Sequence, residues 1–179
     1  MTLKQYIQQT IVSLWIRPFA KEKPLEFRTA LKQAGRILVL LPPADRVLLG
    51  KALDQIASLF PGRDITALHP GLEDTASRKS VALPIHYLNL KKESIRALSK
   101  SAALGKLVKR RFDLFLDLNP AYSLLGIYLC RRARAPVRIG FEKPQSHRFY
   151  NFVYESTCNG RYADALSGLT QFLGSLVSR

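Results

Sequence analysis

The sequence predicts a single α/β domain built as a Rossmann-like, doubly wound parallel sheet. Short, continuous apolar runs such as residues 36–41 and 112–118 are typical of strands that are buried on both faces. Stretches with helical spacing of apolar residues alternate with these runs, and Gly and Pro stand at their boundaries. Strands that alternate with helices form parallel sheets, because each helix carries the chain back across the sheet.

The elements follow one another along the chain in that alternating order. Strands are expected at residues 36–41, 64–68, 84–90, 112–118 and 137–141. Helices are expected from Val47 to Phe60 and at residues 94–111, 121–132 and 162–176, and a polar loop at 69–79. The basic helix at 94–111 turns its apolar residues inward, and the strand FDLFLDL at 112–118 follows it.

The N-terminal part, residues 1–35, is expected to lie outside the domain formed by residues 36–179. Residues 2–20 carry an apolar stripe at helical spacing that includes Trp15, and Pro18 is expected to end or kink the helix. A mixed-charge, basic connector follows. Such an amphipathic helix either lies in a membrane interface or packs on the domain or on a partner protein.

The charge of the chain points to anionic partners. It has 28 Lys and Arg against 13 Asp and Glu, a formal charge of +15 and a pI near 10.2. A surface of this kind attracts nucleic acid, anionic lipid or a phosphorylated substrate. Nucleic acid is the least favoured, because no helix-turn-helix or RRM pattern is present and the aromatics at 149–154 do not alternate with cations.

Motifs for cofactors and metals are not found in the sequence. There is no GxGxxG or Walker loop, and the three histidines are too far apart for a metal motif. Cys130 and Cys158 are expected to be buried free thiols, although a disulfide stays open. With no secretory signal and no apolar run long enough to span a bilayer, we expect a cytoplasmic protein, with peripheral attachment to the membrane's inner face as an option.

Four segments carry the pattern of a known family in the right order. They are RILVLLPPADRVLLGKALDQI from residue 36, FDLFLDLNPAYSLLGIYL from 112, RRARAPVRIGFEK from 131 and GRYADALSGLTQFLGSL from 160. Together they resemble the N-terminal, acceptor-side domain of glycosyltransferase family 9, the bacterial lipopolysaccharide heptosyltransferases. The third segment is the most specific, since it is similar to the family's Gly-Ala-Pro-x-Arg-Ile-Gly-Phe turn and strand.

The resemblance implies one half of a two-domain GT-B enzyme. In that family the N-terminal domain holds a phosphorylated, lipid-linked sugar acceptor, and the C-terminal domain binds the nucleotide-sugar donor. The segments matched here end at the interdomain linker, so the donor half is expected to be missing. The family's catalytic base falls on Asp45, which would take the proton from the acceptor hydroxyl. Asp45 alternatively caps the following helix.

Other residues are expected to line the acceptor site or to bind its anionic groups. Asp117 ends the strongest strand, where ligands of open α/β sheets bind, or else caps the helix that follows. The expected acceptor or anion-binding residues are Arg46, Lys51, Asp117, Arg138, Lys143 and Arg148. No metal and no cofactor is expected.

Two functions therefore remain open from the sequence. The first is a non-catalytic, basic binding module at a membrane surface or in a protein complex, favoured because Ala44 replaces the family's Gly and Pro42-Pro43 stiffens the loop before Asp45. The second is a glycosyltransferase whose donor-binding domain comes from another chain, favoured by Asp45 and the intact RIGF segment. A phosphorylated lipid-linked sugar, a protein partner and an anionic membrane are the expected partners.

Overall fold

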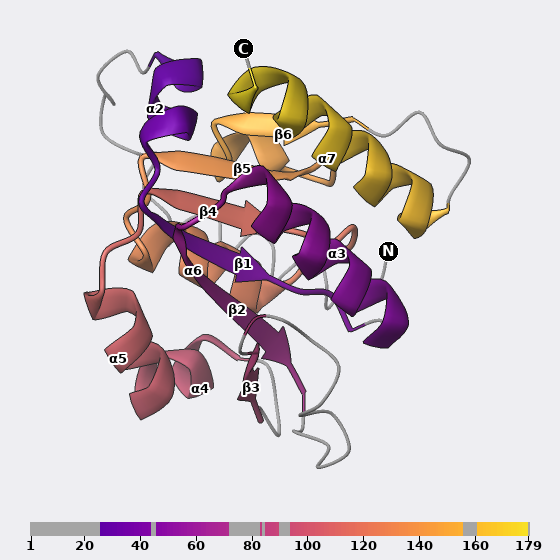
Figure 1. The fold of residues 1–179 in the computed structure, drawn as a ribbon. Coiled ribbons are helices and arrows are strands. Elements are labelled where there is room, and N and C mark those ends of the chain that lie inside the picture. The colour runs from indigo at the N-terminus through magenta and orange to yellow at the C-terminus, as the bar shows by residue number, and fades with distance from the viewer. Residues whose placement is uncertain are drawn as a thin grey trace.

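The computed structural model describes residues 26–43, 46–71, 83, 85–89, 94–155 and 161–178, and it omits the side chains of Arg46 and Val47. The predictions for the helix at 2–20, for Asp45 and for Cys158 lie outside these residues. Within the described part, the chain forms the predicted α/β architecture (Figure 1).

The centre of the molecule is one sheet of six strands, in the order β3-β2-β1-β4-β5-β6. Every neighbouring pair is parallel. The strands are β1 (Arg36–Leu40), β2 (Asp64–Pro70), β3 (Ile85–Leu88), β4 (Leu114–Asp117), β5 (Val137–Phe141) and β6 (Phe152–Tyr154). The prediction of a doubly wound parallel sheet is confirmed.

Helices cover both faces of this sheet (Figure 1). On one face lie α2 (Phe27–Gln33), α3 (Arg46–Leu59) and α7 (Tyr162–Val177). On the other lie α4 (Ile95–Lys100), α5 (Ala102–Lys109) and α6 (Leu124–Arg132). Because successive side chains of a strand point to opposite faces, Ile37 and Val39 of β1 join the first core, and Leu38 joins the second.

Three elements differ from the sequence prediction. The helix expected at 94–111 is two helices, because Ser101 leaves the helical conformation and its Oγ accepts a hydrogen bond from Leu104 N at 3.3 Å. The connector contains α2, whose Leu31 and Ala34 are fully buried, so these residues belong to the domain core. Strand β6 was not expected, since it is only three residues long and half-buried.

The described helices are all too short or too polar to cross a bilayer. Cys130 is a buried free thiol in α6, and its Sγ donates a hydrogen bond to Phe149 O at 2.7 Å. This agrees with the expectation for that residue.

Candidate functional site: a cleft at the carboxyl edge of the sheet

The carboxyl ends of β1 and β4 mark the point where the sheet changes winding direction. The chain leaves β1 into α3 on one face and leaves β4 into α6 on the other. Ligands of open α/β sheets bind at such switch points, because the two loops diverge there and leave a crevice.

A cleft of about 830 Å³ lies at this edge, in the size range of small-molecule sites. It is formed by the loops after β1, β2, β3 and β4, together with the starts of α3 and α7. The residues that line it are Pro42, Pro43, Leu48, Pro70, Gly71, Leu88, Asn89, Asn119, Pro120, Ala121, Tyr122, Ser123 and Tyr162.

The described lining is uncharged and combines two kinds of surface. Prolines and the tyrosines Tyr122 and Tyr162 provide rigid apolar faces. The amides of Asn89 and Asn119 and the hydroxyl of Ser123 provide both donors and acceptors of hydrogen bonds. Such a lining suits a neutral ligand rich in hydroxyl groups better than a bare anion.

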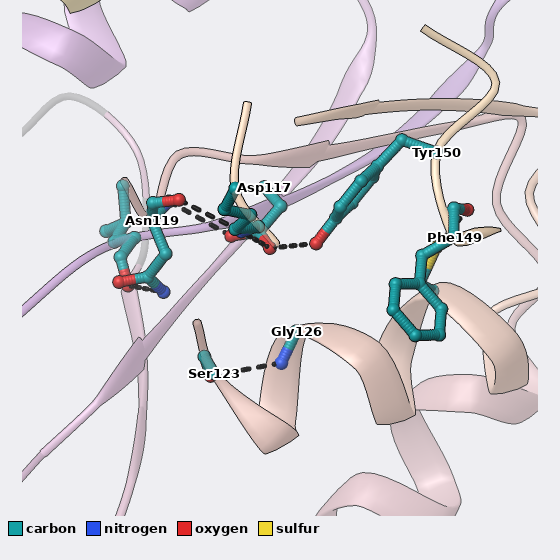
Figure 2. Close-up of polar contacts among 9 residues, drawn as sticks. Asp117, Asn119, Ser123, Gly126, Phe149 and Tyr150 are labelled. Carbon is teal, nitrogen blue, oxygen red and sulfur yellow. Dashed lines mark hydrogen bonds and ion pairs between the residues drawn. The ribbon is translucent and has the colours of Figure 1, made fainter. Parts of the chain in front are cut away.

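Asp117 lies behind the cleft and stabilises its inner wall. It is the last residue of β4, and its side chain is fully buried. Lys143 Nζ lies 2.8 Å from Asp117 Oδ2, and the Tyr150 hydroxyl donates to the same oxygen. Asn119 N donates to Oδ1 at 3.0 Å, so both carboxylate oxygens are bonded (Figure 2).

Lys143 ties this carboxylate to the loop that lines the cleft. Its side chain is 6% exposed, and besides the ion pair its Nζ donates to Asn119 O at 3.0 Å. The ammonium group also stands 5.1 Å from the centre of the Tyr150 ring, within the range of a cation–π interaction. Asn119, in turn, reaches the end of β1 through Nδ2 and Leu41 O, 3.5 Å apart. The four groups therefore hold together the loops that follow β1, β4 and β5.

Two glycines make room for this network. A Cβ on Gly126 would stand 2.6 Å from Asp117 Oδ2, so the carboxylate rests directly on the first turn of α6. A Cβ on Gly140 would meet the Tyr150 ring at 2.9 Å. The glycine of the RIGF segment thus allows Tyr150 to pack across β5 and bring its hydroxyl to Asp117.

The start of α6 adds to the stability of the buried carboxylate. Ser123 is the N-cap, and its Oγ accepts a hydrogen bond from Gly126 N at 3.2 Å (Figure 2). The alternative that Asp117 caps this helix is therefore wrong, because Asp117 accepts from Asn119 N instead. Asp117 still lies near the positive end of the helix dipole, which favours a negative charge there.

Burial keeps two tyrosine hydroxyls of this region protonated. The pKa of Tyr150 is raised well above its usual value, first by burial and then by the charge of Asp117. Burial also raises the pKa of Tyr162, with a smaller contribution from Asp117. The Tyr162 hydroxyl is shielded from solvent and has no hydrogen-bond partner among the described residues. Other atoms of this residue contribute to the wall of the cleft.

The structure brings two of the predicted site residues together, Asp117 and Lys143, and places Arg138, Lys51 and Arg148 elsewhere. Arg138 is buried in β5, where Nε donates to Phe149 O at 3.0 Å and Nη1 to Ala135 O at 2.8 Å. Lys51 is exposed on α3, and Arg148 is exposed in the 3-10 helix η2 (Ser146–Arg148). None of these three lines the cleft, and their anion-binding role stays a prediction. The same holds for Asp45 and for the side chain of Arg46, which lie outside the described part.

The sequence prediction missed Tyr150, Asn119, Gly126 and Tyr162. Asn119 stood at the predicted carboxyl edge and could have been found there by position. Tyr150 could not, because it lies 33 residues from Asp117 in the chain. The described residues contain no cluster of His, Cys, Asp and Glu able to hold a metal ion.

These features define the class of protein, a Rossmann-like α/β domain with a cleft at its switch point. No protein-family model matches the chain, and no curated protein matches it. Among solved structures it is similar to E. coli heptosyltransferase WaaC with ADP, with a TM-score of 0.47 and 15% sequence identity. The match covers 76% of this chain and 47% of that protein, so the chain spans about half the length of its structural relative.

Proposed function

We propose that this chain is a glycosyltransferase-like binding module that holds a sugar in the cleft at the carboxyl edge and acts at a membrane surface or in a protein complex. The observation that carries the proposal is the cleft itself, whose uncharged wall combines apolar rings with the amides of Asn89 and Asn119 and the hydroxyl of Ser123.

A sugar fits the chemistry of this lining. Its hydroxyl groups both donate and accept hydrogen bonds, as do the amides of Asn89 and Asn119. Its apolar C–H faces match the rings of Tyr122 and Pro120. The network of Asp117 and Lys143 fixes the Asn119 loop before the ligand arrives, which reduces the entropy lost on binding.

The described lining supports binding more than sugar transfer. A general base must lie within hydrogen-bond reach of the acceptor hydroxyl and must be free to take its proton. Asp117 is paired with Lys143 and accepts two further hydrogen bonds, and the raised pKa of Tyr162 keeps that hydroxyl protonated. The alternative function, transfer with Asp45 as base and a donor domain from another chain, rests on the sequence resemblance.

The proposal is tested by filling the cleft. Ala121 is an exposed lining residue, so Ala121→Trp should block the cleft while leaving the Asp117 network intact. Ala103→Trp adds the same side chain at an exposed position of α5 that does not line the cleft. Saturation-transfer NMR with methyl mannoside and mannose 6-phosphate as probes should detect binding to the wild type and to Ala103→Trp, and none to Ala121→Trp.

Two results would count against the proposal. Binding of neither probe at millimolar concentration would argue against a sugar site. Equal binding to both tryptophan variants would place the sugar elsewhere on the molecule. Release of nucleotide from an ADP-sugar by the isolated chain would instead support the alternative function.

A further inference from the structure

A group of the exposed cations of the described chain lies at the edge of the sheet opposite the cleft. All strands are parallel, so their amino ends share one edge, and the helices that run back along the sheet end there too (Figure 1). Six exposed cations stand at these positions, and we call them the amino-edge cluster: Arg36, Arg63, Lys109, Arg111, Arg132 and Arg134.

The cluster forms a row across four neighbouring strands. Arg63 precedes β2, Arg36 begins β1, Arg111 precedes β4 and Arg134 precedes β5, which is the order of these strands in the sheet. Neighbouring strands lie about 4.8 Å apart, so the row is roughly 14 Å long. It is also fixed in place, since Arg36 Nη1 donates to Arg110 O at 3.0 Å and Arg63 Nη2 donates to Lys32 O at 3.0 Å.

Carboxylates at this edge are already engaged. Asp64 pairs with Arg110 Nη2 at 2.9 Å and with Nε of Arg36, a member of the cluster, at 4.0 Å. Asp113 accepts from the backbone N–H groups of Gly35 and Arg36. Glu26 accepts from Thr29 N at the start of α2. Most of the positive charge of the cluster therefore faces solvent without a matching carboxylate.

Two of these arginines occupy backbone positions that favour glycine. Arg111 has φ 54° and Arg134 has φ 53°, in the left-handed region. Each is the first residue after the C-cap of a helix, α5 and α6 respectively, where glycine is the usual residue because it has no Cβ. The chain thus carries arginine twice where glycine would fold with less strain. Residues that break a local rule in this way are candidates for function.

Helix α2 begins at the same edge as the cluster. The Phe27 ring stacks on Phe152, the first residue of β6, with centroids 5.1 Å apart, and Arg28 Nε donates to Leu176 O near the end of α7. The start of α2 therefore lies at the amino edge. Residues 2–20, which precede it in the sequence, carry the apolar stripe with Trp15. An apolar stripe and a basic surface in one chain are two membrane-binding signals, and two such signals anchor a protein more firmly than either does alone.

We infer that the amino-edge cluster docks the domain onto an anionic lipid bilayer, with the sugar cleft facing away from the lipid. This inference rests on the proposed function, which takes the chain to be a binding module acting at a surface. A bilayer suits the row better than nucleic acid, because attraction to anionic headgroups requires only a broad cationic face. The consequence is that the ligand reaches the cleft from the aqueous side.

The test uses Arg111→Gly/Arg134→Gly in the full chain. These changes remove two positive charges and relieve the left-handed backbone, so thermal stability should stay unchanged or rise. Co-sedimentation with vesicles of phosphatidylcholine and phosphatidylglycerol should weaken about 30-fold, which corresponds to roughly 1 kcal/mol for each cation near the lipid surface. The matched control is Lys51→Gln/Arg161→Gln, which removes one exposed cation from α3 and one from the N-cap of α7 and should change binding less than about threefold.

Several outcomes would overturn the inference. The first is equal binding to pure phosphatidylcholine vesicles, and the second is an equal loss of binding in the Lys51→Gln/Arg161→Gln control. The third is unchanged binding in the glycine variant, which would mean that the two arginines interact only with the helix dipoles. Loss of duplex DNA binding without loss of vesicle binding would assign the cluster to nucleic acid. Sugar binding by the same variants, measured as above, separates this inference from the proposed function, because the cleft is unchanged in them.

Discussion

Asp117 and Lys143 form a buried pair, with side chains that are 0% and 6% exposed. Replacing one partner leaves the other charge unpaired in the protein interior, which typically costs 3–5 kcal/mol. We therefore expect Asp117→Asn to lower the free energy of unfolding by about 3 kcal/mol, although the two side chains have the same shape. Urea denaturation measures this change.

The double variant Asp117→Asn/Lys143→Met separates the pair from its surroundings. If the two groups act on each other, removing both should cost less than the sum of the single changes. Additive losses, within about 0.5 kcal/mol, would show that the ion pair does not couple the loops after β4 and β5.

Tyr150 gives the fold a dependence on alkaline pH. Its pKa is raised in the folded protein, so the native state holds the proton more tightly than the unfolded chain does. The resulting stability is complete below about pH 10 and is lost as pH rises above that value, by roughly 1.4 kcal/mol per pH unit. The variant Tyr150→Phe should lose stability less steeply between pH 10 and 11, as measured by denaturation at each pH. Identical pH profiles for the two proteins would contradict the assignment.

At the scale of residues, the sequence predicted the carboxylate and the cation but not what joins them. Asp117 was predicted at the carboxyl end of the strongest strand, and Lys143 was named as a cation after the RIGF segment. The contact between them depends on Tyr150, which reaches Asp117 only because Gly140 leaves space for its ring. Spacing along the chain carries no information about that packing, so the hydrogen-bond network around Asp117 could not be predicted from the sequence.

Helix α6 depends on a glycine where propensity alone would prefer alanine. A Cβ at Gly126 would stand 2.6 Å from Asp117 Oδ2, and neither the helix nor the buried carboxylate has room to move. We expect Gly126→Ala to destabilise the protein by about 1–3 kcal/mol, despite the gain in helix propensity. Equilibrium unfolding in urea provides the measurement.

Gly105 in α5 is the matched control for that change. No atom lies within 4 Å of the place where its Cβ would be. Gly105→Ala should therefore stabilise the protein by about 0.5–1 kcal/mol, because alanine favours the helix. If both alanine variants shifted stability in the same direction, the close approach of α6 to Asp117 would not be the cause.

Elements with a strong apolar pattern of their own were predicted well, and those without one were predicted poorly. Strands β1, β4 and β5 are continuous apolar runs, and α3 and α7 have a clear apolar stripe, so periodicity was sufficient. The break between α4 and α5 was not predicted, because the apolar residues keep their helical spacing through Ser101 although the backbone at Ser101 is not helical. Strand β6 was not predicted, because its three residues form a strand by pairing with β5. That pairing cannot be read from the three residues themselves.

In the described part of the molecule, the cleft and the amino-edge cluster lie at opposite edges of the sheet. The carboxyl edge carries an uncharged cleft, and the amino edge carries exposed arginines and lysines. This separation explains how a chain with a formal charge of +15 has a described cleft without a cation in its lining. The sequence predicted the excess charge but not its placement, because placement follows from the direction in which every strand and helix runs.

The central claim, that the carboxyl-edge cleft holds a sugar, is tested most directly by mapping backbone amide shifts during titration of the full chain with methyl mannoside. The account predicts that the largest shifts fall on the amides of Asn89, Asn119, Tyr122, Ser123 and Tyr162. Shifts centred on Arg111 and Arg134 at the amino edge, or no localised shifts at millimolar ligand, would contradict it.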